Sequence, residues 1–512
     1  MSAATHQWTL DALLSPWVKE TVPSLSVSGV TSDSRQVESG DVYLALSGAT
    51  THGIAYASAA VQAGAVAVLV SDQLSAEYQI IVHELQEQKV PLVSVNSLDE
   101  SGVLIASRFY HEPDKSLTVV AVTGTDGKTS VCRFIAQALT ASGRSCGYIG
   151  TLGWGLGDVL QATALTTPDS VMLRRCLAAM RDQGASCVAL EASSHGIAEG
   201  RLDGLALDVA VLTNLGRDHL DYHITLEAYH AAKEQLFHWQ TLKAVVLNAD
   251  DDMGRDLIGK INHIPCFAYS TSADSRSADS RPAATNPDYK TIAARDIAAH
   301  DAGLEFDIVD TGITRHLQTG LLGGFNVDNV LACYASLRAC EIAANDAFHA
   351  LAAVSAVPGR MERLGGSGKV TIVIDYSHTP GALSAAIDAV RVHCKHRLWV
   401  VFGCGGDRDP GKRAPMAQAA QAADHVVLTD DNPRTESSAA IIKDAMAGFD
   451  RPEHVHVIPD RSTAIQFAIS NATSDDLVLI AGKGHENYQI VGNARHHFSD
   501  REQSLAALEL AS

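Results

Sequence analysis

The sequence predicts an α/β protein with three domains, and three observations lead to that prediction. Short apolar runs rich in Val and Ile alternate with Ala-rich amphipathic stretches, a pattern typical of parallel sheets covered by helices. The 512 residues suffice for three to four domains of about 150 residues each. Hydrophobic residues make up 46% of the chain and charged residues 19%, so several cores can be buried.

The first expected domain covers residues 1–96 and is a small α/β unit. Its strands are expected at Val42–Leu46, Ala65–Val70 and Pro91–Val95, around a helical pattern. The polar segment Asn96–Ser101 follows the last of these strands and is interpreted as a linker.

The second and third domains are expected at residues 97–357 and 358–512. The central domain has the strand, glycine loop and helix order of P-loop ATPases, and the C-terminal domain resembles a doubly wound, Rossmann-like nucleotide fold. The central strands are expected at Leu117–Val122, Cys187–Leu190, Val209–Thr213 and Ala244–Asn248, before a helix near Val327–Ile342. The C-terminal strands are expected at Val370–Ile374, Arg397–Phe402, His425–Leu428, His456–Ile458 and Leu477–Ala481.

Charge and composition argue against several classes of function. The formal net charge of −20 disfavours general binding to nucleic acid. We find no apolar run near the ~18 to 20 residues needed to cross a bilayer and no export signal at the N-terminus. Nine scattered cysteines without a C-x-x-C pair are interpreted as buried thiols in a reducing compartment. We therefore expect a cytoplasmic protein without nucleic-acid or membrane partners.

A glycine-rich loop follows the expected strand Leu117–Val122. It reads Thr-Gly-Thr-Asp-Gly-Lys-Thr-Ser over residues 123–130, and a helical pattern continues to Leu139. Glycines allow backbone amides and a helix N-terminus to face phosphates, while Lys128 supplies a positive charge and Thr129 a hydroxyl ligand for Mg²⁺. The usual spacing would place glycine at Val122, so a variant phosphate loop is predicted, with a chance glycine turn as the alternative.

Three polar residues downstream suit the surroundings of such a loop. Glu191 follows the strand Cys187–Leu190, where a carboxylate can hold a Mg²⁺ that bridges ATP phosphates or, alternatively, cap a helix. His219 follows the strand Val209–Thr213 and is a candidate ligand for a second metal, although a single His is more often a satisfied polar residue. Lys233 lies on an expected helix and by itself indicates only a solvated lysine.

Taken together, the motifs resemble the Mur ligase family, whose members join amino acids to the peptidoglycan precursor using ATP. The motifs occur in family order across the second and third expected domains. They are Thr-Gly-Thr-Asp-Gly-Lys-Thr (123–129), Glu-Ala-Ser-Ser-His-Gly (191–196), Asn-Leu-Gly-Arg-Asp-His-Leu-Asp-Tyr-His (214–223), Ala-Ala-Lys (231–233), Asn-Ala-Asp-Asp (248–251), Gly-Arg-Met-Glu (359–362), Asp-Tyr-Ser-His-Thr-Pro (375–380) and Gly-Lys-Gly-His-Glu (482–486).

The resemblance implies an ATP site and a metal site. ATP would contact Gly124, Thr125, Asp126, Gly127, Lys128, Thr129 and Ser130, with Asn326, Arg360 and Asp375 around the nucleotide. Mg²⁺ would be held by Thr129, Glu191, His219 and Lys233, the last matching the family lysine that CO₂ converts to a carbamate. The implied catalytic residues are Lys128, Glu191, His219 and Lys233. Carbamylation needs the neutral amine, so burial that lowers the pKa of Lys233 would favour it.

The substrates implied by the resemblance are UDP-N-acetylmuramoyl-L-alanyl-D-glutamate and meso-2,6-diaminopimelate. Residues expected at the uridine nucleotide and muramoyl dipeptide are Ser32, Ser34, Ala49, Thr50, Thr51, Thr166, Thr167, Ser193, Glu199 and Arg201. The expected diaminopimelate residues are Arg408, Asp431, Asn432, Pro433, Arg434, Gly482 and Glu486. Lysine lacks the distal carboxylate of diaminopimelate, so a guanidinium such as that of Arg434 would separate these two amino acids.

Four positions depart from the family pattern. Asp126 stands where Asn is usual, Leu165 where an Asn can precede the threonines, Glu199 where Gln is common, and Gly381 where Asp follows His-Thr-Pro. The rival interpretations are a lysine-adding ligase, a folylpolyglutamate synthase, and a regulatory protein that uses its phosphate loop as a switch. We expect a monomer, and a reaction in which ATP converts the D-Glu carboxylate to an acyl phosphate that the amine attacks.

Overall fold

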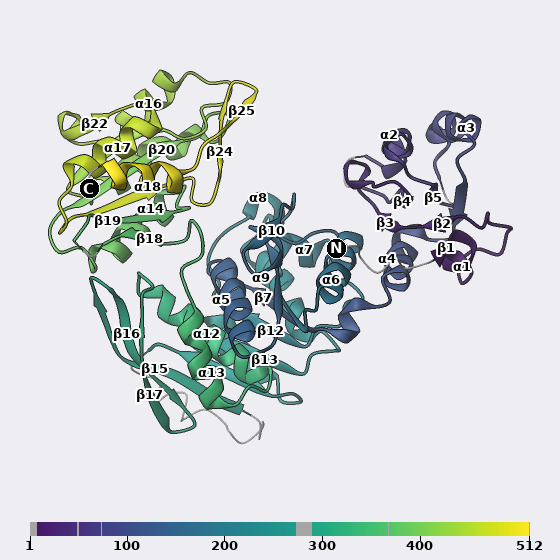
Figure 1. The fold of residues 1–512 in the computed structure, drawn as a ribbon, viewed down its shortest axis with the longest axis horizontal. Helices are drawn as coiled ribbons and strands as arrows, with labels where there is room; N and C mark the ends of the chain where they lie inside the picture. The colour runs from purple at the N-terminus through teal and green to yellow at the C-terminus, as the bar shows by residue number, and fades with distance from the viewer. Residues whose placement is uncertain (1–7, 49–50, 73, 273–288, 367, 511–512) are drawn as a thin grey trace. The chain divides into compact units, whose positions relative to one another are not determined.

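The protein is described by a computed structural model, which covers residues 8–48, 51–72, 74–272, 289–366 and 368–510 (Figure 1). The chain divides into two compact units. The first unit comprises Met1–Ala268, Pro282–Tyr289 and Cys333–Ala350, and the second comprises Tyr269–Arg281, Lys290–Ala332 and Leu351–Ser512. The α/β class and the three sheet-containing regions predicted from the sequence are confirmed.

The N-terminal part of the first unit holds a four-stranded parallel sheet in the order β3-β4-β5-β6. Its strands are β3 (Gly29–Thr31), β4 (Asp41–Leu44), β5 (Ala67–Ser71) and β6 (Leu92–Val95), its helices are α1 (Leu10–Leu14), α2 (Ala57–Ala63), α3 (Gln79–Glu87) and α4 (Leu98–Phe109), and β1 (Trp8–Thr9) pairs with β2 (Ser26–Val27). The interpretation of Asn96–Ser101 as a linker is wrong. Leu98 is buried in the same core as Leu44, so the chain turns directly into α4.

The larger sheet of the first unit carries the predicted phosphate loop. Its strands follow the order β10-β9-β8-β11-β7-β12-β13-β14, parallel from β8 to β13, with β9 antiparallel to both β8 and β10. They are β7 (Thr118–Thr123), β8 (Cys146–Gly150), β9 (Gly153–Leu156), β10 (Val159–Gln161), β11 (Cys187–Glu191), β12 (Val209–Leu212), β13 (Ala244–Asn248) and β14 (Cys266–Ser270). The sequence predicts four of these strands.

Helices cover both faces of this sheet because its central strands are apolar on both sides. Leu173 and Leu177 of α6 and Leu257 of α10 share a core with Val119 and Val188, while α5 packs against β7, β8 and β11. The helices are α5 (Lys128–Ala141), α6 (Ser170–Asp182), α7 (Ser194–Ala198), α8 (Leu220–His223), α9 (Leu226–Glu234), α10 (Asp252–Lys260) and α13 (Ala344–Ala350). The carboxyl ends of β7, β11 and β12 therefore supply the polar loops.

Three antiparallel strands precede the C-terminal sheet and were not predicted from the sequence. They are β15 (Tyr289–His300), β16 (Gly303–Asp310) and β17 (Ile313–Thr319), followed by α12 (Phe325–Ala339). Leu304, Phe306 and Ile308 are buried at alternate positions of β16. This period of two is that of a sheet with one covered face.

The C-terminal sheet of the second unit has the order β18-β19-β23-β20-β21-β22, parallel except for β18. Helices α14, α15 and α16 pack on one face, and α17 and α18 pack on the other (Figure 1). The strands are β18 (Glu362–Gly365), β19 (Thr371–Asp375), β20 (Leu398–Cys404), β21 (His425–Asp430), β22 (Val455–Val457) and β23 (Leu477–Ala481), with a hairpin of β24 (Tyr488–Val491) and β25 (Ala494–His497). The helices are α14 (Pro380–Arg391), α15 (Arg413–Ala420), α16 (Ser438–Met446), α17 (Arg461–Asn471) and α18 (Asp500–Leu510).

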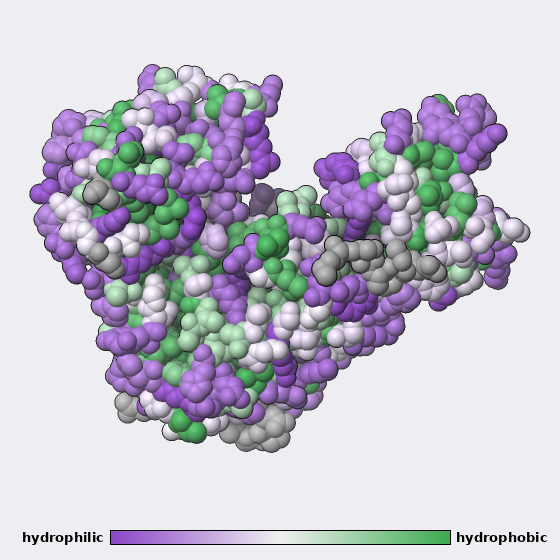
Figure 2. Space-filling view, viewed as in Figure 1, coloured by the Kyte–Doolittle hydropathy of each residue, from purple (hydrophilic) through white to green (hydrophobic). Residues whose placement is uncertain are grey.

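The hydrophilic surface and the burial of the cysteines agree with what the composition of the chain predicts. Figure 2 shows hydrophilic side chains over much of the visible face, with hydrophobic residues in scattered patches. Within the described ranges, we find no helix with the length and apolar character that crossing a membrane requires. All nine cysteines fall in the described part of the chain as free thiols; eight are buried and Cys394 is half-buried, as predicted.

Candidate active site

The phosphate loop lies between β7 and α5, as predicted. Gly124 and Gly127 adopt φ angles of 148° and 81°, in the left-handed region that favours glycine. A Cβ atom on Gly124 would also collide with the hydroxyl of Thr213, so this position has no room for a side chain. Gly127 is the N-cap of α5 and offers no side chain to cap it. The first turn of this helix can therefore turn its amides toward an anion.

Lys128 begins α5 and folds back over the loop. Its Nζ atom donates hydrogen bonds to the carbonyl oxygens of Gly124, at 2.9 Å, and Thr125, at 2.7 Å. The Asp126 side chain is exposed, while its backbone carbonyl accepts a 2.6 Å bond from Thr213 on the neighbouring strand end. Ser130 is half-buried in the first helical turn. The loop is thus held in shape by its own lysine and by β12.

Glu191, at the end of β11, is fully buried and accepts four hydrogen bonds. Its Oε1 atom accepts from the Tyr148 hydroxyl at 2.5 Å and the Thr151 amide at 3.0 Å. Its Oε2 atom accepts from the hydroxyls of Thr129 at 3.0 Å and Thr151 at 3.1 Å. Thr129 and Glu191, both predicted to hold Mg²⁺, therefore lie side by side, and the carboxylate is fixed in orientation.

Lys233 is only 1% exposed and reaches the phosphate loop from α9. Its Nζ atom donates a 2.6 Å bond to the Gly124 carbonyl, which also accepts from Lys128, and it lies 4.6 Å from the ring centre of Tyr229. Burial, and secondly the charge of Lys128, lower the pKa of Lys233 to about 6. The side chain therefore carries a largely neutral amine at pH 7, contrary to the solvated lysine that its sequence context alone would indicate.

His219 lies beside this group but is more open. Its φ angle is 53° and its side chain is about half exposed, with a ring centre 4.7 Å from that of His195 and 6.4 Å from that of Tyr229. Burial, and secondly His219, lower the pKa of His195. Tyr229 also contacts Lys233. It therefore lies beside two of the predicted metal-binding side chains, those of His219 and Lys233.

The residues expected at the muramoyl dipeptide gather around the backbone of Glu191. The Thr167 hydroxyl donates to the Glu191 carbonyl at 2.7 Å and lies 2.9 Å from the Ser193 hydroxyl. Arg201 donates from Nη1 to the Thr167 carbonyl at 2.7 Å and forms an ion pair with Glu199. The Thr166 hydroxyl lies 3.2 Å from that of Thr151. Glu199 thus partly neutralises Arg201.

The residues expected at the uridine end lie in the N-terminal part of the first unit. The Ser32 hydroxyl donates a 3.0 Å bond to Asp169, the N-cap residue of α6, so this residue joins the two sheets of the unit. Ser34 starts a short 3₁₀ helix and Thr51 is exposed. Ala49 and Thr50 lie outside the described residues.

The other three residues expected at the nucleotide lie in the second unit. Asp375, at the end of β19, accepts from the amides of Met361 at 2.9 Å and Ser377 at 3.0 Å. The Arg360 guanidinium lies 4.7 Å from the ring centre of Tyr376. Asn326 is separate from this group: it is buried in α12 and donates from its amide to the Leu322 carbonyl at 2.8 Å.

All the residues expected at diaminopimelate lie on loops at the carboxyl ends of β20, β21 and β23. Asn432 donates from Nδ2 to Glu486 Oε2 at 3.2 Å, which joins two of these loops. Arg434 has a φ angle of 53° and donates to the Gly406 carbonyl at 2.7 Å. A Cβ atom on Gly405 would contact Arg434 at 3.0 Å and Arg408 at 3.7 Å, so both arginines flank one backbone position.

The remaining predicted pocket residues are close to this group. Asp431 is buried, and Gly482, with a φ angle of 114°, leaves just enough room for its carboxylate. Pro433 follows Asn432 in the same buried turn. Sequence reasoning missed Lys483, which is fully buried and donates to Glu486 at 3.0 Å and Asn432 at 3.3 Å. Lys483 lies inside the Gly-Lys-Gly-His-Glu motif (482–486), and this position is the signal that could have identified it.

Two further groups in these sites were missed. Tyr148 and Thr151, which hold Glu191, lie outside any quoted motif and left no sequence signal. Tyr376 and His485 lie with ring centres 5.4 Å apart, and burial, followed by the charge of Arg360, lowers the pKa of His485 to about 4. Tyr376 lies in the Asp-Tyr-Ser-His-Thr-Pro motif (375–380) and His485 in the Gly-Lys-Gly-His-Glu motif (482–486).

The fold and the site define a nucleotide-binding α/β protein with a phosphate loop, a carboxylate at the adjacent strand end and a second set of polar loops on the C-terminal sheet. The chain belongs to the Mur ligase family. Residues 26–110 match the Mur ligase family catalytic domain, residues 122–337 the Mur ligase middle domain, and residues 359–484 the Mur ligase glutamate ligase domain.

Related proteins cover nearly the whole chain. It is 42% identical over 485 residues to the UDP-N-acetylmuramoyl-L-alanyl-D-glutamate–2,6-diaminopimelate ligase of Pseudomonas aeruginosa, covering 94% of this chain and 95% of the relative. It is 38% identical over 508 residues to the ligase of the same name from Vibrio vulnificus, covering 98% and 99%. A solved structure of a ligase with this name has a TM-score of 0.67 at 33% identity, covering 98% of this chain and 99% of that one.

A more distant solved structure shares the fold. The MurF ligase of Thermotoga maritima in complex with ADP has a TM-score of 0.60 at 18% identity and covers 94% of this chain and 97% of that one. The fold of this chain is therefore shared with that ligase along nearly its whole length.

Proposed function

We propose that this ligase uses ATP to join meso-2,6-diaminopimelate to the D-Glu carboxylate of UDP-N-acetylmuramoyl-L-alanyl-D-glutamate. The observation that carries the proposal is the connection through Glu191. Its side chain is bonded to Thr129 of the phosphate loop, and its backbone carbonyl is bonded to Thr167. Residues predicted to bind phosphate and residues predicted to bind the dipeptide thus form one hydrogen-bonded group. The substrates named for the relatives agree with it.

The side chains of Thr129 and Glu191 fit Mg²⁺. Their oxygens are 3.0 Å apart, close to the roughly 2.9 Å between neighbouring ligands in an octahedron with 2.0–2.1 Å metal–oxygen bonds. Among the described residues no three His, Cys, Asp or Glu side chains converge, so phosphate oxygens and water would complete the shell. A bound Mg²⁺ would neutralise phosphate charge. The Thr129 hydroxyl would then turn its proton away from Glu191.

Lys233 is suited to carbamylation. The reaction needs an unprotonated amine, and the buried setting that lowers the pKa of Lys233 supplies it near neutral pH. Carbamylation would convert the buried Lys233 amine beside the phosphate loop into an anion. This anion could share a second Mg²⁺ with His219. The half-exposed His219 ring is open enough to accept such a role.

The residues then assist a two-step reaction. The D-Glu carboxylate attacks the γ-phosphorus of ATP, ADP leaves, and an acyl phosphate forms; the amine of diaminopimelate attacks its carbonyl carbon, loses a proton and expels phosphate. Lys128 would have to leave the carbonyls of Gly124 and Thr125 to reach the ATP phosphates. Arg201 would orient the dipeptide. Arg408 and Arg434, which flank Gly405, would bind the distal carboxylate of diaminopimelate.

We further propose that the enzyme works in the cytoplasm as a monomer. Nine free thiols in the described chain suit a reducing compartment.

The test is phosphate release by the purified protein with ATP, Mg²⁺ and the nucleotide dipeptide. Meso-diaminopimelate, L-lysine and no amine are compared, and the product is weighed by mass spectrometry. Release that requires diaminopimelate and yields the tripeptide supports the proposal. Release with lysine would contradict the specificity, and release without amine would favour a nucleotide switch.

A further inference from the structure

The two loops that form the predicted amino-acid pocket leave the C-terminal sheet from strands that are not neighbours. The first follows β21, which ends at Asp430, and the second follows β23, which ends at Ala481. Strand β20 lies between them in the sheet. Hydrogen bonds between strands therefore connect the ends of β21 and β23 only through β20, and a contact that reaches both ends would fix their spacing further.

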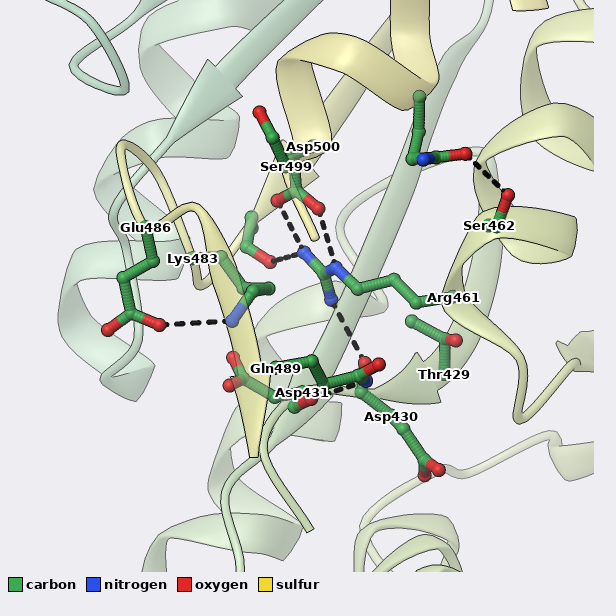
Figure 3. Close-up of polar contacts among 12 residues, drawn as sticks. Thr429, Asp430, Asp431, Arg461, Ser462, Lys483, Glu486, Gln489, Ser499 and Asp500 are labelled. Carbon is green, nitrogen blue, oxygen red and sulfur yellow. Dashed lines mark hydrogen bonds and ion pairs between the residues drawn. The ribbon is translucent and has the colours of Figure 1, made fainter. Parts of the chain in front are cut away.

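A single buried arginine reaches both strand ends. Arg461 is the first residue of α17 and its side chain is completely buried, as is Asp500, the first residue of α18 (Figure 3). Arg461 donates from Nε to Asp500 Oδ1 at 2.7 Å and from Nη2 to Oδ2 at 2.8 Å. This bidentate pair fixes the plane of the guanidinium.

The same guanidinium donates to the last carbonyl of each strand. Nη2 donates to the Ala481 oxygen at 3.0 Å, and Nη1 donates to the Asp430 oxygen at 3.3 Å (Figure 3). A guanidinium presents five donors in a rigid plane, whereas an ammonium presents three from one atom. Lysine at this position could keep the charge opposite Asp500 but could not hold both carbonyls at this spacing.

Side chains of the two loops also contact each other beyond these carbonyls. Asn432, two residues after Asp430, donates to Glu486 Oε2 at 3.2 Å, and Lys483, two residues after Ala481, donates to both side chains at 3.3 and 3.0 Å. These contacts depend on the distance between the strand ends. They also set the positions of two groups predicted to bind diaminopimelate.

We propose that Arg461, held by Asp500, is a positioning residue that fixes the spacing of the two loops and so sets the affinity for the amino-acid substrate. This inference rests on the proposed function. The Arg461 side chain is completely buried, so a substrate bound at the loops would not reach it.

The test compares Asp500→Asn and Arg461→Lys with Asp476→Asn. Asp476 is also buried in the second unit, but it lies at the opposite, amino end of β23, where it accepts bonds from the Arg397 and Thr473 amides. Asp500→Asn and Asp476→Asn make the same change in a buried aspartate. Thermal unfolding is measured for all variants, together with the Michaelis constants for ATP, nucleotide dipeptide and amine.

We expect Asp500→Asn and Arg461→Lys to raise the Michaelis constant for the amine roughly tenfold or more, since displacement of about 1 Å in a site costs up to 10²-fold. The constants for ATP and dipeptide should change less than about twofold. Asp476→Asn should lower the unfolding temperature without this selective change. An unchanged amine constant in Asp500→Asn, or equal changes for all three substrates, would overturn the inference.

The wild-type protein separates this outcome from the proposed function. It is assayed first with each amine, and the variants are then compared with the amine that it uses. A wild-type preference for lysine would contradict the proposed substrate, while a selective rise in the constant for that amine would still support the role of Arg461.

Discussion

Each of the two units contains an almost completely buried lysine, and the neighbours of the two lysines differ. Lys233, in the first unit, donates to a backbone carbonyl and lies near a second lysine, Lys128, whose charge opposes its own. Lys483, in the second unit, is ion-paired with Glu486 and donates to Asn432. Burial alone therefore does not decide what a lysine does. The first setting favours a reactive neutral amine, and the second uses the ammonium to hold two side chains in place.

The largest effect is expected for Lys233→Ala. Ligation should fall by at least about 10³-fold, because the substitution removes the anionic group proposed beside the phosphates. Acetate should restore part of the activity by supplying a carboxylate. The rate of phosphate release with and without acetate measures this effect, and near-wild-type turnover by the variant would contradict the role of Lys233.

Lys483→Met should have a smaller and more selective effect. Loss of the ammonium removes the donor that Glu486 and Asn432 share and leaves the Glu486 carboxylate without its ion-pair partner. The Michaelis constant for diaminopimelate should therefore rise about 10- to 100-fold. Acetate should not restore this variant, which makes it the matched control for Lys233→Ala. Steady-state kinetics with each substrate varied in turn would test this prediction. Equal losses for every substrate would show that Lys483 supports the fold rather than the pocket.

The pKa of Lys233 also predicts how stability depends on pH. The unfolded chain binds the Lys233 proton below the usual pKa of 10.5, while the folded chain binds it only below about 6. Stability relative to Lys233→Met should therefore rise with pH between these values, by about 1.4 kcal/mol per unit, and should not change further with pH below about 6. Urea denaturation of both proteins at pH 7, 8 and 9 in CO₂-free buffer measures the difference. A difference that stays constant across this range would contradict the burial of a neutral amine.

Several decisive residues were predictable because they follow strands. Glu191 and the phosphate loop stand at the ends of apolar runs that the sequence marks clearly. The burial of Lys233 was not predictable from its helix, because it depends on the Gly124 carbonyl more than a hundred positions away. The Arg461–Asp500 pair joins residues 39 positions apart and follows no periodic pattern. Strands β15, β16 and β17 were missed because polar residues interrupt their apolar positions, so they lack the continuous apolar runs that mark the central strands.

The smallest effect concerns the loop itself. Asp126, one of the positions that depart from the usual pattern, places a negative charge on the exposed side of the phosphate loop. Asp126→Asn should tighten ATP binding about threefold, a modest change because water and salt screen an exposed charge. Equal Michaelis constants for ATP in the two proteins would contradict this expectation and would show that the side chain points away from the phosphates.

The most direct measurement follows an oxygen atom of the substrate. Nucleotide dipeptide labelled with ¹⁸O in both oxygens of the D-Glu γ-carboxylate is incubated with ATP, Mg²⁺ and meso-diaminopimelate. The masses of the phosphate and peptide products are then measured by mass spectrometry. An acyl phosphate route predicts one ¹⁸O in the released phosphate and a tripeptide that keeps the other. Unlabelled phosphate, or phosphate release without tripeptide, would contradict the proposed ligation.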